Sequence, residues 1–399
     1  MRPGVNEPMN NPQSRPQAPK NPRQSRPMWD STMAAASAPE KQFLTPKRED
    51  TMRPPTSVNA LRRSLLALAV SAAFVPAAFA EGPIVIKFSH VVASDTPKGK
   101  AAEFFARRAG ELTKGRVKVE VYLNSQLYKD KEEIEALQLG SVQMLAPSLS
   151  KFAHLGVKEF EAFDLPFIFN DYNDLHAVTS GPVGRKLLQK LDSRGITGLA
   201  YWDNGFKVMS ANKPLKAVSD YKGLRMRIQP SKVLDAQMRA VGALPQVLAF
   251  SETYQALQTR VVDGTENPPS NLYTQKMHEV QKHLSTTNHG YLGYAVVVNK
   301  KFWDGLPGNI RAALTQAMTE ATQVANDTAF QDNLEALNRI KASGKSTVHE
   351  PTMEERRQLM RAMLPVHQQM ATRIGAQTIE EIYRATGFKP LPDLPRPAP

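Results

Sequence analysis

The stretch Ile84-Val85-Ile86-Lys87-Phe88-Ser89 opens the part of the chain that decides the fold. Its β-branched residues favour a strand. Thr96-Pro97 then predicts the start of a helix, because apolar residues follow it three and four positions apart. Alternating valines at 117–121 predict a second strand, a helix is expected over 129–140, and a third strand over 142–146. This βαβαβ order predicts a parallel sheet with right-handed crossovers.

A second run of strands and helices follows Trp202. Ser231 is expected to cap a helix that runs through Val241, and Ser251 a helix that ends near Asp263-Gly264. Two α/β blocks in one chain favour a protein that binds a ligand beyond the carboxyl ends of its strands. The strands expected in this part of the chain are 224–228, 246–249 and 292–299.

The C-terminal quarter is predicted to be almost wholly helical. One apolar stripe continues towards Ile340, which predicts a helix long enough to brace two lobes. Further helices are expected over 354–374 and 378–384, and the Pro-rich tail 389–399 is expected to be disordered. The stripe consists of Ile310, Leu314, Ala317, Ala321 and Val324.

The first 80 residues are not expected to belong to the fold. Residues 1–58 hold 11 of the 30 prolines and show no apolar periodicity, which predicts disorder. Residues 59–80 have the charged pair, apolar run and small-residue end of a secretory signal peptide, with cleavage expected after Ala80. The alternative, a membrane anchor, is disfavoured because the run 64–75 has 12 residues and falls short of the roughly 20 apolar residues that span a bilayer. We hypothesise that translation starts at Met52 and that residues 1–51 are not made.

Composition limits the class of protein. The net charge is +13, and without residues 1–80 it is 40 − 33 = +7. The positive residues are scattered, as in Lys98 and Lys100, so a nucleic-acid partner is not expected and an anionic ligand is the simpler interpretation. The chain has no cysteine, which excludes disulfides, Cys-ligated metals and thiol catalysis.

A search for catalytic chemistry finds little. The chain lacks the nucleophile-elbow, Walker, zincin and dinucleotide-binding patterns, so neither an enzyme nor a cofactor or metal is expected. His90 stands out among the histidines because it ends the first strand. Arg227 lies on the same face of its strand as Arg225, where it is either a rigid fork for a carboxylate or a salt-bridged surface residue. The cluster 263–268 is typical of a helix end followed by proline.

Six segments, taken in order, resemble one family. The chain from about 85 to 385 is similar to the periplasmic solute receptors of tripartite ATP-independent periplasmic (TRAP) transporters, and most to their dicarboxylate-binding (DctP-type) members. The segments are IKFSH at 86–90, LPFIF at 165–169, YWDNGFK at 201–207, GLRMR at 223–227, FSETYQALQ at 250–258 and VDGTEN at 262–267.

The resemblance implies an α/β fold of two lobes, with crossing strands and a long bracing helix. Lobe I is then expected at 81–204 and 292–332, and lobe II at 205–291 and 333–388. It further implies a periplasmic receptor, not an enzyme, that delivers an organic acid to a sodium-driven TRAP permease, and we expect it to be a monomer. The alternatives are a ligand-sensing partner of a membrane histidine kinase and an exported α/β enzyme.

The resemblance also implies a ligand site. Arg227 matches the family's carboxylate-binding arginine, Asn267 an asparagine that reaches the same carboxylate, and Phe250 an aromatic wall. Lys207 and Ser148 replace an arginine and a glutamate of the sialic-acid receptors, and the loss of the glutamate argues against sialic acid. With His90 or Lys151 nearby, the cleft is expected to hold a second carboxylate, which favours a C4-dicarboxylate such as succinate, malate or fumarate. Further candidates, placed only by their adjacency to matched segments, are His90, Lys151, Trp202 and Tyr291.

Overall fold

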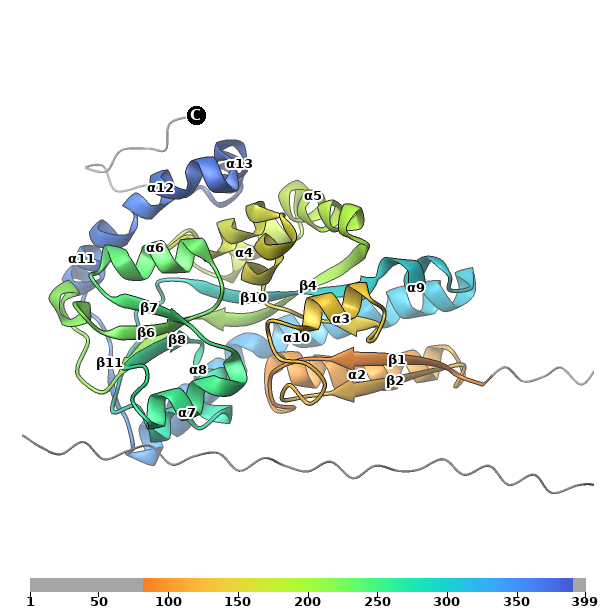
Figure 1. Ribbon diagram of the computed structural model, residues 1–399, viewed down its shortest axis with the longest axis horizontal. Helices are drawn as coiled ribbons and strands as arrows, with labels where there is room; N and C mark the ends of the chain where they lie inside the picture. The colour runs from red at the N-terminus through yellow and green to blue at the C-terminus, as the bar shows by residue number, and fades with distance from the viewer. Residues whose placement is uncertain (1–81, 390–399) are drawn as a thin grey trace, which may run out of the picture. The chain divides into compact units, whose positions relative to one another are not determined.

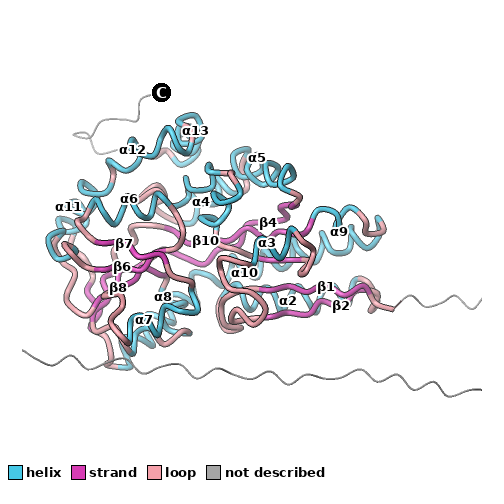
Figure 2. The backbone as a smooth tube through the Cα atoms, viewed as in Figure 1, coloured by secondary structure: helices cyan, strands magenta, loops and turns pink. Residues whose placement is uncertain are grey.

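The computed structural model describes residues 82–389. The expected disordered segment 1–58, the expected signal peptide 59–80 and residues 390–399 of the expected tail therefore lie outside the described residues. The described chain forms two sheets flanked by helices (Figures 1 and 2). Among the helices of residues 82–389, none combines the length and apolar composition that crossing a bilayer requires.

The first sheet has five strands in the order β2-β1-β3-β10-β4. β1 pairs in parallel with β2 and β3, so the parallel sheet predicted for this part of the chain is confirmed. β10 then pairs antiparallel with β3 and β4, which joins residues far apart in sequence. The strands are β1 (Ile84–Ser89), β2 (Val117–Tyr122), β3 (Met144–Leu145), β4 (Ile196–Phe206) and β10 (Tyr291–Asn299).

The helices beside this sheet mostly follow their sequence signals. α2 (Pro97–Leu112) begins where predicted, because the Thr96 hydroxyl accepts the Gly99 N–H. α3 is shorter than the expected helix 129–140, since residues 129–132 form a turn before it. The others that accompany this part of the chain are α3 (Glu133–Gln138), η1 (Leu149–Leu155), η2 (Lys158–Asp164), α4 (Tyr172–Thr179), α5 (Pro182–Lys190), η3 (Leu191–Arg194) and α9 (Lys300–Asp304).

The second sheet has six strands in the order β11-β9-β5-β8-β6-β7. β6 pairs in parallel with β7 and β8, while β5 pairs antiparallel with β8 and β9. β7 begins and ends two residues before the expected strand 246–249. The strands are β5 (Val208–Ala211), β6 (Arg225–Ile228), β7 (Leu244–Val247), β8 (Gly264–Asn267), β9 (His283–Ser285) and β11 (Thr347–His349).

Two expectations in this second block are wrong. Ser251 caps no helix: it lies inside the 3-10 turn η5 (Phe250–Glu252), and α7 (Thr253–Gln258) follows directly. Residues 264–267 form β8 instead of a helix end, because the strand pairs on both sides with β5 and β6. A Cβ on Gly264 would lie 2.3 Å from the Ser210 carbonyl oxygen, so glycine permits this close pairing. The cap that was predicted correctly is Ser231, whose hydroxyl accepts the Leu234 N–H at the start of α6 (Lys232–Ala240).

The long helix expected towards Ile340 is α10 (Gly308–Ser343), and it packs along α2 and β4 and against α8 (Pro269–Thr274). Its Asn333 amide donates to the Asn204 carbonyl, and its oxygen accepts the Ser270 N–H. The single helix expected over 354–374 is two, α11 (Met353–Met363) and α12 (Pro365–Ile374), because Pro365 has no N–H to continue the first. α13 (Ala376–Thr386) covers the expected helix 378–384.

Two short connections carry the chain between the sheets, and the long helix α10 later leads it from β10 to β11, a third passage. The chain leaves β4 for β5 at Lys207, and it returns from β9 to β10 through residues 286–290. The two crossings touch, since the Lys207 N–H donates to the Gly290 carbonyl at 2.8 Å. This is the two-lobe α/β arrangement with crossing strands that the sequence predicted.

The lobe boundaries stay a prediction. The hydrophobic cluster that contains Leu175, Val178 and Leu187 also contains Ile374 and Ile382. The last two helices therefore pack with residues assigned to lobe I, although 333–388 was assigned to lobe II.

Candidate ligand-binding site

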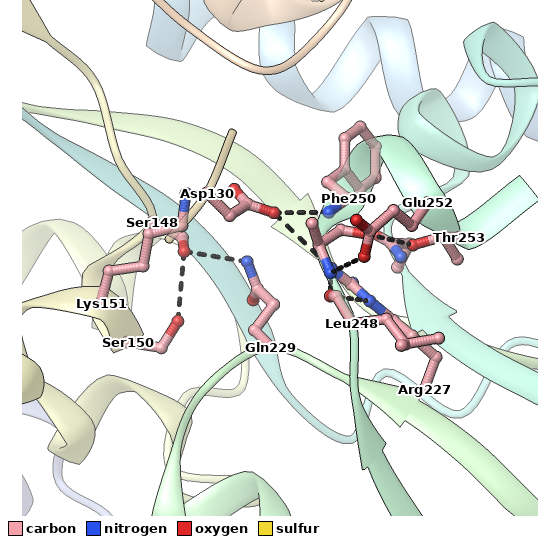
Figure 3. Close-up of polar contacts among 12 residues, drawn as sticks. Asp130, Ser148, Ser150, Lys151, Arg227, Gln229, Leu248, Phe250, Glu252 and Thr253 are labelled. Carbon is pink, nitrogen blue, oxygen red and sulfur yellow. Dashed lines mark hydrogen bonds and ion pairs between the residues drawn. The ribbon is translucent and has the colours of Figure 1, made fainter. Parts of the chain in front are cut away.

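Arg227 lies at the centre of the candidate site, on β6 and 1% exposed. Its Nε and Nη2 donate to the Leu248 carbonyl oxygen at 3.1 and 2.9 Å (Figure 3). Its Nη2 also lies 3.9 Å from Oδ2 of Asp130. Burial lowers the pKa of Arg227 and Asp130 opposes this, but a guanidinium remains charged at neutral pH. Only two of its five N–H donors are used on Leu248, so it has donors for a carboxylate.

The two arginines of β6 divide the two roles that the pattern left open. Arg225 is the salt-bridged surface residue, since its side chain is 44% exposed and its Nε and Nη2 bind both oxygens of Asp263 at 3.0 and 2.8 Å. Arg227 is the buried one. Alternation puts both arginines on one face of β6, but the side chain of Arg227 is buried and that of Arg225 is exposed.

A buried ion cluster lies beside Arg227. The Lys151 ammonium, on η1, contacts the carboxylates of both Asp130 and Glu133. Burial acts to raise the pKa of Asp130, but Lys151 and Arg227 outweigh it and hold that pKa at about 2. Burial raises the pKa of Glu133, although Lys151 opposes it. The charge of Lys151 is therefore balanced by the two carboxylates that contact it. Asp130 connects this ion cluster with Arg227.

Asp130 also links two distant segments. Its Oδ2 accepts the Phe250 N–H at the start of η5. The Phe250 ring lies 5.8 Å from the guanidinium carbon of Arg227, within the range of a cation–π contact. Phe250 is 6% exposed and packs beside the Arg227 guanidinium, as expected for the aromatic wall that the resemblance implied.

Ser148 is the second link across the site. Its hydroxyl accepts the side-chain amide of Gln229, two residues beyond Arg227, at 2.8 Å, and lies 3.1 Å from the Ser150 hydroxyl (Figure 3). Ser148 precedes η1 and bridges to Tyr294 of the first sheet, whereas Gln229 follows a strand of the second. The site is therefore assembled from both sheets.

Asn267 lies on the same face of the second sheet as Arg227. Arg227 is opposite Thr265 in the parallel ladder, and Asn267 is two residues further along β8. The Asn267 oxygen accepts the Asn271 amide at 3.2 Å. The network continues through Asn204, whose amide donates to Asn271 at 3.0 Å and to the Tyr294 hydroxyl at 2.6 Å.

His90 and Lys98 lie at the carboxyl end of β1. Both ring nitrogens of His90 are buried, and neither makes a well-formed hydrogen bond among the described residues, although the Val92 backbone lies near the ring. Burial, reinforced by the charge of Lys98, lowers the pKa of His90 to about 3. The Lys98 ammonium donates to the Ala146 carbonyl at 2.9 Å and lies 3.6 Å above the Tyr294 ring. This places His90 near the polar network of the site.

Lys207 lies elsewhere. Its ammonium is 2.8 Å from Oε1 of Glu266, which alternation directs to the opposite face of β8 from Asn267. His289 lies 2.9 Å from the other oxygen of Glu266. Burial acts to raise the pKa of Glu266, but Lys207 and His289 outweigh it and hold the pKa at about 2. The structure places Lys207 in an ion cluster at the crossing between the sheets.

Trp202 and Tyr291 are also apart from Arg227. The Trp202 ring packs 5.9 Å from that of Phe88, and its Nε1–H donates to Thr322 of α10. The Tyr291 hydroxyl donates to Asp203 at 2.7 Å, and its ring contacts Phe206. Both belong to the hydrophobic core, in two separate clusters.

A cavity of about 420 Å³ opens next to the site. Its lining includes Val91 and Asn124 from the first lobe, and Ser251 and Tyr254 from the second. Val91 directly follows His90, and Ser251 directly follows Phe250, so the cavity is lined by neighbours in sequence of two candidate residues. Within residues 82–389 no cluster of acidic and histidine side chains has the makings of a metal site.

Sequence reasoning missed four polar residues of this group. Asp130 and Glu133 occur in the charged run 129–133, which has the pattern of a solvated helix face. Lys98 was treated, together with Lys100, as one of the scattered positive residues. Gln229 directly follows the predicted strand 224–228, and its spacing of two residues from Arg227 is the one signal that could have pointed to it.

Comparison with known proteins places the chain in a family. The model of bacterial extracellular solute-binding proteins, family 7 (DctP), matches residues 88–373, and the chain belongs to that family. The C4-dicarboxylate-binding periplasmic protein DctP of Rhodobacter capsulatus is 63% identical over 320 residues, which are 80% of this chain and 96% of that protein. Its namesake from Vibrio cholerae is 45% identical over 303 residues, 75% of this chain and 90% of that protein.

Solved structures agree. A TRAP periplasmic solute binding protein from Sulfurospirillum deleyianum, with bound succinate, is 47% identical with a TM-score of 0.74, over 76% of this chain and 99% of that chain. Another from Pseudomonas aeruginosa, with bound L-malate, is 45% identical with a TM-score of 0.70, over 72% of this chain and all of that chain. The family is one of solute receptors rather than enzymes.

Proposed function

We propose that this protein is a periplasmic receptor that captures a C4-dicarboxylate and delivers it to a TRAP permease. The observation that carries the proposal is the buried guanidinium of Arg227, which is fixed on a strand. It has N–H donors in addition to the two that bond to the Leu248 carbonyl. Taking a carboxylate out of water is costly unless fixed donors replace its hydration. A strand-mounted arginine supplies two parallel charge-assisted bonds in one direction.

The surrounding residues support a small ligand with two acidic ends. Asn267 shares the face of Arg227, and Phe250 and Ser148 bound the same space from opposite sheets. Relatives whose names state C4-dicarboxylate binding, and structures that hold succinate and malate, favour the same solute class. We propose Arg227, Asn267, Phe250 and Ser148 as ligand contacts, with His90 and Lys151 beside them and with Lys207, Trp202 and Tyr291 supporting the lobes.

The receptor is proposed to act as a monomer and to bind no nucleic acid. The expected signal peptide accounts for export, and the charge of +7 without residues 1–80 suits an anionic solute.

Calorimetric titration of the purified protein tests the proposal. Succinate, malate and fumarate should bind one per chain with a dissociation constant in the micromolar range or below, about −8 kcal/mol or more favourable. Butyrate, the matched four-carbon monocarboxylate, should bind at least roughly 100-fold more weakly, because one buried charged contact is lost. If none of the dicarboxylates binds, or butyrate binds equally well, the dicarboxylate assignment is wrong.

A further inference from the structure

Lys98 is a buried cation whose charge the protein does not pair. It is 1% exposed, on the first turn of α2. Its ammonium reaches a carbonyl oxygen, that of Ala146, and the face of the Tyr294 ring, and no carboxylate among the described residues lies within ion-pair distance of it. Lysine is almost never fully buried without such a partner.

The two buried carboxylates nearest to Lys98 are engaged elsewhere. Asp130 and Glu133 both contact Lys151, and Asp130 also accepts the Phe250 N–H. Counting Lys98, Lys151 and Arg227 against these two acids leaves a buried charge of 3 − 2 = +1. The surplus belongs to Lys98 and Arg227, the two cations that no carboxylate contacts at hydrogen-bond distance.

A polar network leads from Lys98 towards the strand face that carries Arg227. From Lys98 the network runs through Tyr294, Asn204 and Asn271 to Asn267, which shares the face of Arg227. Lys98 belongs to the first lobe and Arg227 to the second. The two cations that no carboxylate contacts at hydrogen-bond distance thus come from opposite sides of this network.

The adjacent His90 is a second sign of a ligand. It is 1% exposed, and neither ring nitrogen makes a well-formed hydrogen bond in the described chain, although the Val92 backbone is near enough to oppose the lowering of its pKa. A buried imidazole without hydrogen bonds is costly, and a bound acceptor or donor relieves the cost. Its ring and the Lys98 ammonium both lie at the carboxyl end of the first sheet, where α/β proteins bind ligands.

We propose that Lys98 receives the second carboxylate of the ligand, with His90 beside it, and thereby selects dicarboxylates over monocarboxylates. This inference rests on the proposed function, since it assigns the other end of the same solute. It makes binding pH-dependent, because the ammonium must be protonated to receive the carboxylate.

The direction of the pH dependence follows from the surroundings of Lys98. Burial lowers the pKa of Lys98 to about 7, with Glu133 and Asp130 opposing and Lys151 adding to the shift. A ligand carboxylate raises that pKa again, so binding takes up a proton. At pH 7 the uptake should be roughly half a proton, and affinity should fall up to about tenfold per unit as the pH rises above 7.

The other groups that face Lys98 do not produce this signal. His90 and Asp130 have pKa values of about 3 and 2, and Tyr294 has one of about 12. The carboxylates around Lys151 raise its pKa despite its burial. Glu133, whose pKa burial raises, is the one exception, and it is retained in a Lys98→Met variant, in which proton uptake on binding succinate should be lost.

The experiment is calorimetric titration of the wild type, Lys98→Met and Lys100→Met with succinate and with butyrate. Lys98→Met should bind succinate at least roughly tenfold more weakly and butyrate with unchanged affinity. Lys100→Met is the matched control: this lysine is on the same helix but half-exposed and paired with Asp332, so its loss should leave both affinities unchanged.

Two further readouts separate the inference from simpler explanations. Without ligand, Lys98→Met should melt at or above the wild-type temperature, because it removes an unpaired buried charge, whereas a structural lysine would lower it. Wild-type titrations in two buffers of different ionisation enthalpy should show the proton uptake without any variant. Unchanged succinate affinity in Lys98→Met, or wild-type binding without proton uptake, overturns the inference, while a wild type that binds no dicarboxylate overturns the proposed function itself.

Discussion

At the scale of single residues, the site depends on which of two similar arginines is buried. Arg225 and Arg227 share one strand face, and Arg225 is held at the surface by Asp263 while Arg227 is enclosed by Phe250, Leu248 and Asp130. The strand and the shared face could be predicted from the alternation of the sequence. The depth of each residue could not, because it depends on segments 20 or more positions away.

Arg227→Lys should weaken succinate binding although the charge is kept. Lysine offers a point charge in place of a planar fork, so part of a desolvated carboxylate loses its donor. Affinity should fall roughly ten- to several-hundred-fold, for a cost of about 1–3 kcal/mol or somewhat more for a charged group. Calorimetry measures this, and Arg225→Lys is the matched control, for which no loss of affinity is expected. Equal affinities in both variants would remove Arg227 from the site.

The residues of the site that could not be predicted are charged residues whose sequence context is typical of a protein surface. Lys98, Asp130 and Glu133 occur among other charged residues, a pattern typical of solvated segments. They are buried because Lys151, Phe250 and Tyr294 come to them from other elements. No local pattern carries such information, since ion pairs between distant segments depend on the tertiary fold.

At the scale of elements, local signals decided what could be predicted. α2 and α6 begin at Thr96 and Ser231 as expected, since the caps bond within three residues. β8 was missed because a four-residue strand exists only through pairing with β5 and β6. The break between α11 and α12 was missed although Pro365 signals it.

The long helix α10 supports both lobes through Asn333, and Asn333→Ala should destabilise the protein. The change leaves the buried Asn204 carbonyl and Ser270 N–H without this partner, at a cost of about 1–3 kcal/mol each. Thermal unfolding should show a lower midpoint, by roughly 2–4 °C for each kcal/mol in a chain of this size. Asn338→Ala, at an exposed position of the same helix, should change the midpoint little. Equal midpoints would show that Asn333 does not brace the lobes.

At the scale of the whole molecule, the order of strands explains where the ligand must lie. Two sheets joined by crossings at Lys207 and 286–290 present their facing edges to one site. The periodic pattern predicted two α/β blocks, but the two-lobe arrangement came from the resemblance to TRAP receptors. The reason is physical: β10 pairs with β3 across nearly 150 intervening residues, and such pairing leaves no periodic trace.

We predict that the lobes separate when a solute is taken up. Arg227 is 1% exposed, so a solute from water reaches it only when the lobes separate. The crossings are short, and a hinge there would move the Ser148–Gln229 and Asp130–Phe250 contacts apart.

The most direct test of the account is a crystal structure of the protein with bound succinate. One carboxylate is predicted within hydrogen-bond distance of the Arg227 guanidinium and the Asn267 amide, in a fork with two parallel bonds. The succinate should contact residues of both lobes, with Phe250 on one side. Succinate bound away from Arg227, or held by a single lobe, would contradict the account.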